Sequence, residues 1–544
     1  MVGGLQMTDA ILGMGAANAP IQRPKLDHDT GILTWVIFGS LMAVGLFFTA
    51  YSLYSDVQAS GMPVTSVAPF LLLIVALLIA LGFEFVNGFH DTANAVATVI
   101  YTHSMPANVA VLWSGFFNFL GVLTSSGIVA YGIISLLPVE LILQVGSGAG
   151  FAMVFALLIA AILWNLGTWW LGLPASSSHT LIGSIIGVGI ANSLLNGGNG
   201  TSGVDWSKAV EIGYSLLLSP LFGFVCAALL LLLMKATVRV PALFAEPKGD
   251  QPPPWPIRML LVFTCTAVSF FHGSNDGQKG MGLIMLILIG TVPVTYALNR
   301  APAPNHVAAF SAAAKEASVI IEGKAAGFNI IGNPRPAVTQ YISLRKISEG
   351  TYPSLAALVR DISTQVESAG SLTKVPLAQI GNVRNDMYIA SEAIRYLMKD
   401  KENELKPEQV SKLKSFKAEL DSATKFIPFW VKVAIAIALG LGTMVGWKRI
   451  VITVGEKIGK SHMTYAQGAS AELVAAATIA AADGFGLPVS TTHVLSSGVA
   501  GAMTANGSGL QFATIRNLLM AWVLTLPCAI TLSALLFTLF RAIF

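Results

Sequence analysis

Charged residues are scarce in this sequence. Only 11% of its 544 residues are Asp, Glu, Lys or Arg, while 54% are hydrophobic and the mean hydropathy is +0.69. The charges are nearly absent from long apolar stretches and gather in a few other segments. This distribution excludes an ordinary soluble globule and indicates a protein that crosses a lipid bilayer several times. The formal net charge of +4 is too small to indicate a nucleic-acid partner for a chain of this size.

Cysteine is also scarce. Cys226, Cys265 and Cys528 all lie within apolar stretches and far apart in the sequence, which argues against both a disulfide framework and a metal cluster. The first twenty residues lack the basic start and the apolar run of a cleaved signal peptide. We therefore expect membrane insertion to depend on the first membrane helix itself.

What the sequence does contain is a series of apolar stretches long enough to span a bilayer. They predict an all-α polytopic membrane protein with about 10–12 membrane segments, including broken helices and re-entrant hairpins. Two further pieces, after His179 and after His493, are short or rich in glycine and are expected to be the return arms of hairpins. The longer stretches cover residues 32–54, 67–89, 107–137, 151–173, 213–234, 257–271, 281–298, 429–446, 465–482 and 517–540.

Two pairs of motifs show that the chain is a duplication. The segment GFHDTANAV aligns with GSNDGQKGM, which places Asp91 on Asp276 at an offset of about 185 residues. The segment LPASSSHTL aligns with LPVSTTHVL at an offset of about 314 residues. A charged, helix-favouring segment between residues 299 and 426 accounts for nearly all of the difference between the two offsets. It is therefore predicted to be a soluble helical insert within the second copy.

This duplication gives the predicted domain organisation. The parts are an N-terminal extension with an extra membrane helix (1–60), repeat 1 (61–235), a Pro-rich cytoplasmic linker (236–256), the first part of repeat 2 (257–298), the insert (299–426) and the second part of repeat 2 (427–544).

The short basic loops predict the orientation. The linker and residues 447–460 are rich in Lys and Arg, so both are expected in the cytoplasm. A single crossing at 429–446 then puts the insert outside, in the periplasm. The segment 257–298 must cross with its Asp motif in the middle, which predicts a broken helix there. The two copies start on opposite faces, and this is the inverted-repeat signature of secondary transporters.

Asp91 and Asp276 are the first candidate functional residues. A carboxylate near the middle of a bilayer costs about 2.5–3.5 kcal/mol, so water, a cation or a proton is expected to compensate it. The alternative is a helix cap. Three residues after each Asp stand Asn94 in the first copy and Lys279 in the second. The lysine could replace a bound cation, pair with an Asp, contact an anion, or simply extend to the membrane surface.

The hydroxyl-rich motifs follow apolar spans and precede helical pieces. Three hydroxyls at a helix start offer side-chain donors beside unpaired backbone N–H groups, and the positive helix end favours an anion. Two such tips, one from each copy, can enclose a tetrahedral oxyanion, although ordinary helix caps are the alternative. His179 and His493 follow directly and could orient a loop, carry a proton or cap a helix. The hydroxyl residues are Ser176, Ser177, Ser178, Ser490, Thr491 and Thr492.

The polar cluster also includes Glu84, Asn87, His90 and His272. Only the first copy has the glutamate, because its counterpart in the second copy is Ser269. An unmatched acid and a histidine are candidates for proton handling. Because His90 aligns with Asn275, its imidazole could instead serve only as a hydrogen-bonding group.

At these motifs the sequence resembles the inorganic phosphate transporter (Pit) family, and in particular its bacterial low-affinity, proton-coupled branch. The resemblance lies in NGFHDTANAVATVIYT, WNLGTWWLGLPASSSHTLIG, HGSNDGQKGMGL, GEKIGKSHMTYAQG and GLPVSTTHVLSS. It covers the chain from about residue 67 onward, apart from the insert. It implies import of inorganic phosphate across a bacterial inner membrane by alternating access. It also implies protons as the coupling ion, and a neutral complex of phosphate with a divalent metal such as magnesium as one transported form.

The same resemblance implies a central phosphate site between the two Asp motifs and the two hydroxyl-rich tips. The matching positions are Asp91, Asn94, Ser176, Ser177, Ser178, Asn275, Asp276, Ser490, Thr491 and Thr492. Lys279, Glu84, His90, His179 and His493 are assigned to coupling or charge balance. Sodium-coupled relatives carry Asn in place of Lys279, which suggests that this lysine substitutes for a sodium ion.

Other readings stay open at this point. Within transport, sulfate is the nearest alternative substrate, but unlike phosphate it offers no proton to the two carboxylates. An intramembrane serine hydrolase would use Ser176 or Ser177 with His179 and Asp91, yet such an enzyme needs one site rather than two copies. A channel fits the paired charged motifs less well than a transporter. We therefore expect no enzymatic activity and no bound cofactor, and we leave a homo-oligomer open.

Overall fold

The computed structural model describes residues 24, 26 and 31–543, apart from 61–67, 92, 138, 144–145, 198–203, 300–305, 326–331 and 401–402. These residues form helices, and the only β-pairing among them is an isolated bridge between Gly459 and Leu510. Eight helical spans of the described part are long and apolar enough to cross a membrane. They are α1 (Ile32–Ala59), α2 with α3 (Ala68–Asp91 and Ala93–Tyr101), α4 (Ala107–Thr124), α7 (Gly148–Trp170), α8 (Ser177–Leu195), α9 (Trp206–Thr237), α10 (Trp255–Thr291) and α21 (Phe512–Ile543).

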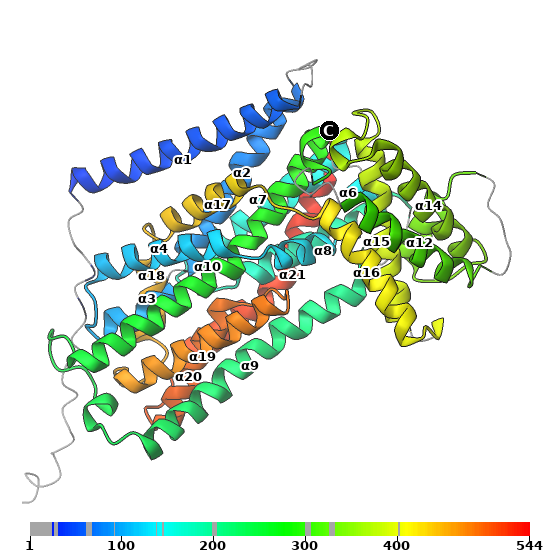
Figure 1. The fold of residues 1–544 in the computed structure, drawn as a ribbon. Coiled ribbons are helices and arrows are strands. Elements are labelled where there is room, and N and C mark those ends of the chain that lie inside the picture. Colours follow the sequence, from blue (N-terminus) through cyan, green and yellow to red (C-terminus); the bar gives the residue numbers. More distant parts are fainter. Residues whose placement is uncertain are drawn as a thin grey trace, which may run out of the picture.

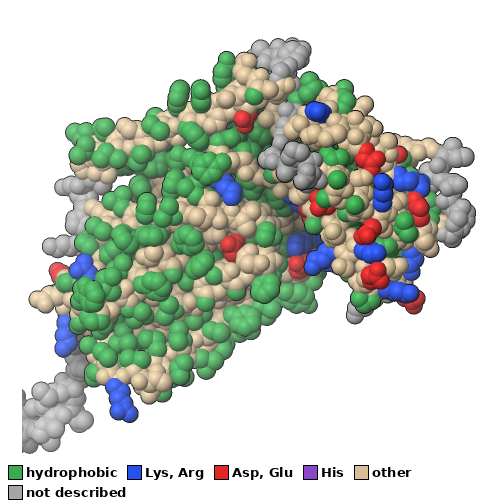
Figure 2. Space-filling model, viewed as in Figure 1, with side chains coloured by type: hydrophobic (Ala, Val, Ile, Leu, Met, Phe, Trp, Pro, Cys, Tyr) green, Lys and Arg blue, Asp and Glu red, His purple; other side chains and the backbone are tan. Residues whose placement is uncertain are grey.

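These long helices gather into one apolar block (Figure 1). Large side chains on its outer helices, such as Leu217 on α9 and Val523 on α21, are exposed. Figure 2 shows a nearly continuous hydrophobic surface over this block. An apolar exterior of this extent suits a lipid environment, because lipid removes the penalty that water imposes on exposed hydrocarbon.

Shorter helices complete the block. The soluble-type helices α12 to α16 gather at one end of it, which we call the insert end (Figure 1). The connection between α9 and α10 marks the opposite end, which we call the linker end. The remaining elements are α5 (Ile128–Ile134), α6 (Val139–Leu143), η1 (Pro241–Phe244), α11 (Pro293–Tyr296), α12 (His306–Glu322), α13 (Arg335–Leu344), α14 (Thr351–Ala369), η2 (Leu372–Lys374), α15 (Ile380–Lys399), α16 (Pro407–Thr424), α17 (Phe429–Gly442), α18 (Lys448–Glu456), α19 (Tyr465–Gly484) and α20 (Thr491–Asn506).

The basic loops lie together at the linker end. Arg258, at the start of α10, donates to the carbonyl of Ser104 just beyond α3 (2.8 Å). The hydroxyl of Tyr101, the last residue of α3, donates to Glu456 at the end of α18 (2.7 Å). Both loops that the charge pattern assigns to the cytoplasm are thus on one face, opposite the insert. This arrangement agrees with the predicted orientation, which stays a prediction.

Two helical hairpins enter the block from opposite ends. In the first, α7 leads to α8 through a turn near Arg449, at the linker end, whose guanidinium donates to the carbonyl of Trp170 (2.7 Å). In the second, α19 leads to α20 through a turn at the insert end, where Gly486 packs against Ile128 of α5. The hydroxyl-rich motifs occupy the two turns, as predicted. We call residues 174–178 the first tip and residues 488–492 the second tip.

The helices that carry the Asp motifs run in opposite directions. α2 ends beside the end of α17, where Gly88 lies against Leu439 and Gly442, and therefore runs from the insert end towards the linker end. α10 starts from the linker and runs the other way. Together with the opposed hairpins, this antiparallel pair gives the inverted relation expected of the two copies.

One prediction about the second copy is wrong. The Asp276 motif does not lie at a helix break, because α10 continues without interruption for 37 residues and joins the stretch 257–271 to the first part of the stretch 281–298. Its glycines allow close packing instead. A Cβ on Gly273 would lie 2.2 Å from the carbonyl oxygen of Asn118, and one on Gly280 would lie 2.4 Å from the Glu84 side chain. In the first copy the expected break falls at Thr92, which lies outside the described residues.

The insert is attached to the block through α9. Asp205, the N-cap residue of α9, accepts hydrogen bonds from the hydroxyl of Tyr396 and from Arg395 (3.0 Å), and Arg345 lies 3.3 Å away. Burial alone would raise the pKa of Asp205, but the Tyr396 hydrogen bond and the two guanidinium groups lower it to about 2. Asp205 is therefore ionised at neutral pH, and the insert is held by charge-assisted bonds.

The additional N-terminal helix α1 lies along the outside of the block and packs on α17 (Figure 1). Its Asp56 carboxylate accepts hydrogen bonds from the Tyr296 hydroxyl (2.7 Å) and the Trp430 indole (3.0 Å). Only 11% of the most apolar stretch of this helix is buried against the rest of the protein, so lipid is the expected environment for most of the helix.

The close approach of α4 and α10 gives a test of this packing. A Cβ on Gly121 would lie 2.0 Å from the backbone oxygen of Phe270, so Gly121→Ala must separate the two helices. We expect a loss of about 1–3 kcal/mol, seen as a lower melting temperature of the purified protein in detergent. The control is Gly213→Ala on α9, whose Cβ would meet open space and which gains up to about 1 kcal/mol of helix propensity. Equal melting temperatures for both variants would contradict the packing described.

Candidate functional site

The two predicted aspartates meet in the middle of the block. Asp91 is the last residue of α2, Asp276 lies halfway along α10, and both are buried. The hydroxyl of Ser177, on the first tip, lies 3.0 Å from Asp91 Oδ2 and 3.3 Å from Asp276 Oδ2. The two carboxylates thus share one hydroxyl neighbour, and each requires compensation for its negative charge at this depth.

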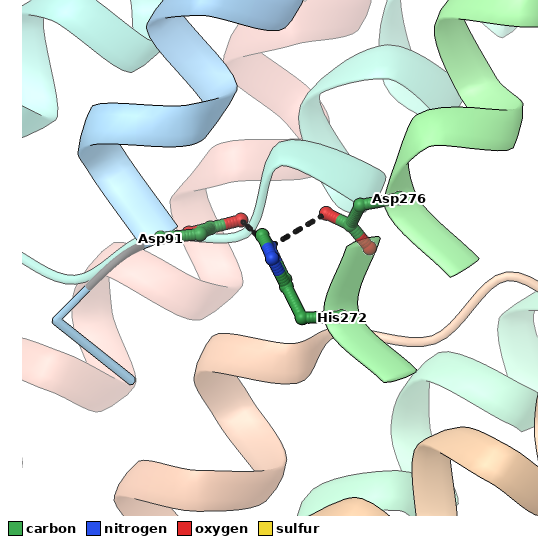
Figure 3. Close-up of side chains that lie close together, drawn as sticks. All are labelled: Asp91, His272 and Asp276. Atoms are coloured by element: carbon green, nitrogen blue, oxygen red, sulfur yellow. Dashed lines mark ion pairs between the residues drawn. The ribbon is translucent and has the colours of Figure 1, made fainter. Parts of the chain in front are cut away.

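His272 stands between the two acids, as Figure 3 shows. Its Nε2 lies 3.5 Å from Asp276 Oδ2 and 3.9 Å from Asp91 Oδ2, and its Nδ1 lies 2.7 Å from Asn118 Oδ1 of α4. The three side chains offer ligand atoms that all lie within 4.8 Å of one another, which is close enough to hold a cation. An imidazolium could supply the same positive charge without a metal.

Lys279 does not extend to the membrane surface. It is fully buried, and its Nζ lies 2.7 Å from Asp276 Oδ2 and 3.5 Å from the Ser177 hydroxyl. Because Asp276 and Lys279 are three residues apart on one helix, they lie on the same face and form an intrahelical pair. This pair balances one of the two negative charges, and the charge of Asp91 still needs a proton, a cation or a protonated histidine.

The two tips have matching local geometry. Ser176 accepts a hydrogen bond from the backbone N–H of His179 (3.2 Å), and Ser490 accepts one from His493 (3.1 Å), so each caps the helix that follows. The tips also touch, since the hydroxyl of Ser178 donates to the carbonyl of Val489 (2.7 Å). Ser176 and Ser490 therefore serve as helix caps, and the hydroxyl residues that follow them in each tip remain available as binding groups.

The second tip also reaches the acids. The Thr492 hydroxyl donates to Asp91 Oδ1 at 2.6 Å, so hydroxyls from both copies bind one carboxylate. The neighbouring Thr491 hydroxyl is buried and has no hydrogen-bond partner among the described residues, and neither has the Oδ1 atom of Asp276. A buried hydroxyl and a buried carboxylate oxygen without partners are costly, and they mark positions where a ligand would be accommodated.

The histidines that follow the tips form a pair. The rings of His179 and His493 lie 4.7 Å apart between centroids, and His493 stacks on Trp522 of α21 at 4.2 Å. Ser177 donates to the carboxylates rather than to His179, whose Nδ1 has no hydrogen-bond partner in the described part of the chain. The serine–histidine contact required by the hydrolase reading is therefore absent from the described site.

The other predicted residues surround this centre. Glu84 is buried against Gly280, with one carboxylate oxygen 3.4 Å from the Asn87 amide and the other unpartnered among the described residues. His90 lies 3.1 Å from Asp91 and 3.2 Å from the Thr168 hydroxyl, which makes it a bridge between α2 and α7. Asn94 belongs to α3, but its side chain lies outside the described part.

Asn275 contacts the second tip rather than the acids. Its amide donates to the carbonyl of Leu487 (3.2 Å), and its Oδ1 lies 3.5 Å from the backbone nitrogen of Val489. Sequence reasoning missed several residues that hold this region together. Asn118 orients His272, and Asp483 receives hydrogen bonds from Ser274 (2.7 Å) and Gln278 (2.6 Å). A polar residue inside an apolar span was the available signal for Asn118.

The centre as a whole is occluded, since Asp91, Ser177, His272, Asp276 and Lys279 each expose 2% or less of their surface. It combines hydroxyl donors from both copies, two carboxylate acceptors and one buried ammonium. Such a set can bind a small ion that both donates and accepts hydrogen bonds, and it requires movement of a tip to admit that ion.

Comparisons with known proteins find a matching family model and several similar proteins. A family model described as the phosphate transporter family matches residues 87–533. The chain is 42% identical to the low-affinity inorganic phosphate transporter PitA of Escherichia coli strain K12 over 483 residues, covering 85% of this chain and 95% of that protein. It is 41% identical to PitB of the same strain (85% and 95% covered) and 38% identical to a low-affinity inorganic phosphate transporter of Buchnera aphidicola (86% and 96% covered).

A solved structure named the sodium-dependent phosphate transporter aligns with 87% of this chain and all of its own, at 21% identity and a TM-score of 0.49.

The Asp276–Lys279 pair gives a test of the site's electrostatics. Lys279→Met leaves an uncompensated buried carboxylate, and we expect it to destabilise the protein by about 3–5 kcal/mol. Adding Asp276→Asn removes that carboxylate charge, so the double variant should melt at a higher temperature than Lys279→Met alone. Lys414→Met, on the exposed face of α16, is the control and should not change the melting temperature. If Lys279→Met and Asp276→Asn lowered the melting temperature by amounts that simply add in the double variant, the two side chains would not interact.

Proposed function

The chain belongs to the phosphate transporter family, and from that premise we propose that it imports inorganic phosphate with protons by alternating access. Members of this family are transporters rather than enzymes, so the hydrolase reading is dropped. The chain is a multi-pass membrane protein. Its relatives are bacterial, and we place it in the bacterial inner membrane.

One observation carries the proposal most directly. Two hydroxyl-bearing tips, entering from opposite ends, meet at a pair of carboxylates in the middle of the block, where Ser177 and Thr492 both bind Asp91. Phosphate near neutral pH carries both ionised oxygens and a P–OH group. The tip hydroxyls can donate to the former, and a carboxylate can accept from the latter. Sulfate lacks that proton and would face Asp91 and Asp276 with acceptor atoms only.

The charge of the site supports a cation or proton as co-substrate. Phosphate is an anion, and binding it beside two carboxylates requires additional positive charge. Lys279 supplies one such charge permanently. A divalent metal carried with phosphate would find oxygen and imidazole ligands in Asp91, His272 and Asp276, and we propose this metal–phosphate complex as one transported form. Its two positive charges would offset the charge of the phosphate.

The opposed hairpins support two gates around one site. Withdrawal of the second tip would open the centre towards the insert end, and withdrawal of the first tip would open it towards the linker end. Because the Ser178–Val489 contact joins the tips directly, the closed structure couples the two gates. Glu84 lies about two turns before Asp91 on α2, has one buried carboxylate oxygen without a partner among the described residues, and is the candidate that takes up the coupled proton.

Uptake of radiolabelled phosphate into proteoliposomes tests the proposal. We expect a gradient with acid outside to drive uptake, a sodium gradient not to do so, and magnesium to increase it. Asp276→Asn should abolish uptake, while Asp56→Asn, which removes a carboxylate of α1 away from the site, should retain it. Phosphate uptake driven by a sodium gradient alone would contradict proton coupling. Uptake of sulfate but not phosphate would contradict the proposed substrate.

The role of Lys279 predicts a change of coupling ion. Lys279→Asn removes the fixed ammonium and leaves Asp276 free to bind a cation. We expect the variant to transport little phosphate in the absence of sodium and to regain uptake when sodium is added. Lys279→Gln, which is longer and leaves less space for an ion, is the matched control. If Lys279→Asn kept the ion dependence of the unaltered protein, Lys279 would not occupy the place of a coupling cation.

A further inference from the structure

A second polar cavity, outside the central site, lies where the insert meets the apolar block. Its volume is about 600 Å³, and its walls come from α5, the start of α9, the insert helices α15 and α16, and the start of α17. Figure 2 shows acidic and basic side chains side by side at this junction, in contrast to the apolar surface of the block. The cavity thus lies at the end of the block towards which the turn of the second hairpin points.

The charge of this cavity is predominantly positive. Five cationic side chains line it and only two acids, Glu392 and Asp421. The cations are Lys208, Arg395, Lys417, Lys425 and Lys432. The first four have carboxylate partners, and Lys417 and Lys425 share Asp421 at 2.5 and 2.9 Å. Lys432 differs, because its Nζ donates to the backbone carbonyl of Ser125 (2.7 Å) and has no carboxylate partner in the described part of the chain.

The floor of the cavity is connected to the central site. The short helix α5 contributes Ile128 and Tyr131 to the cavity wall. The backbone N–H of Val129 on the same helix donates to the side chain of Gln278, two residues beyond Asp276 (2.9 Å). Ile128 also packs against Gly486, just before the second tip. Helix α5 therefore lines the cavity and also contacts α10 close to Asp276 and the turn that leads to the second tip.

We propose that this cavity is an outer vestibule that binds free inorganic phosphate, through the excess positive charge of Lys425 and Lys432, before it passes α5 to the central site. This inference rests on the proposed function. A cleft lined by an excess of one sign of charge raises the local concentration of the oppositely charged ion and its rate of association. The volume is much larger than a bare phosphate requires and accommodates a hydrated ion, which suits a transient stop rather than tight binding.

The insert acquires a role in this proposal. Lys417 and Lys425 belong to the insert and its connection to α17, so the vestibule exists only because the insert covers the end of the block. The Tyr131 hydroxyl donates to the carbonyl of Phe426 (2.7 Å), which fixes α5 to that connection. The insert thus supplies charge at the mouth of the pathway and holds the helix that closes it.

The first test compares kinetic constants for phosphate uptake. Lys425→Gln with Lys432→Gln should raise KM about three- to tenfold and leave the maximal rate within about twofold, because the central site is intact. Lys374→Gln with Lys414→Gln removes the same charge from exposed insert positions outside the cavity and should leave KM unchanged. Lys425→Arg with Lys432→Arg keeps the positive charge and should keep a low KM, while a preserved maximal rate shows that the glutamine variant is folded. An unchanged KM in the glutamine variant overturns the vestibule.

A second test separates the vestibule from the proposed transport. Binding of radiolabelled inorganic phosphate is measured on Asp276→Asn protein in detergent, in which the central site is disabled. Saturable binding that disappears when Lys425→Gln and Lys432→Gln are added supports the vestibule, even if the unaltered protein shows no uptake. Absence of such binding, together with normal uptake by the unaltered protein, overturns the vestibule and leaves the proposed function intact.

A phosphate group can also come from a lipid headgroup, and the composition of the proteoliposomes distinguishes the two sources. A free-phosphate site predicts the same KM difference in pure phosphatidylcholine and in mixtures with anionic phosphatidylglycerol. If the lysine substitutions changed only the dependence on phosphatidylglycerol, the occupant would be a headgroup and the proposal would be wrong.

Discussion

The burial of two carboxylates at one point in the middle of a membrane protein is the constraint on which the rest of this structure depends. Asp91 and Asp276 come from antiparallel helices and meet beside Ser177. Left alone, two such charges repel each other strongly in a medium of low dielectric constant. Lys279 and His272 on α10, and hydroxyls from both tips, supply the compensation. These groups come from α10 and from the two tips, so the acids determine how these elements must converge.

That convergence requires very close helix packing, and glycine makes it possible. α10 touches α4 at Gly273 and α2 at Gly280, where a Cβ would collide with Asn118 or with Glu84. The same glycines suggest a broken helix when only the sequence is considered, because glycine is common at irregular backbone. The two explanations differ only in what lies opposite each glycine. That information depends on tertiary packing, and for this reason the continuity of α10 could not be predicted.

Much of the site nevertheless follows from the sequence. The duplication brings the four motifs to one place, and the spacing of three between Asp276 and Lys279 puts both on one helix face. Patterns within single motifs could not show that Asn118 orients His272, or that Asp483 of α19 binds Gln278 of α10. These contacts join residues far apart in the chain. The vestibule was beyond prediction for the same reason, since α5, α9 and the insert form it jointly.

The insert also constrains how the two copies can move. It is inserted in the sequence of the second copy, yet Arg395 binds Asp205 and Lys399 lies 3.4 Å from Glu211, both in or beside α9 of the first copy. A motion of one copy against the other must therefore carry the insert with α9 or break these ion pairs. Because Asp205 is ionised and paired with two guanidinium groups, breaking these pairs would leave a largely buried carboxylate without compensation. A motion that preserves these pairs would leave the insert on α9, and α5 and the second tip are the elements between the cavity and the central site that would have to move instead.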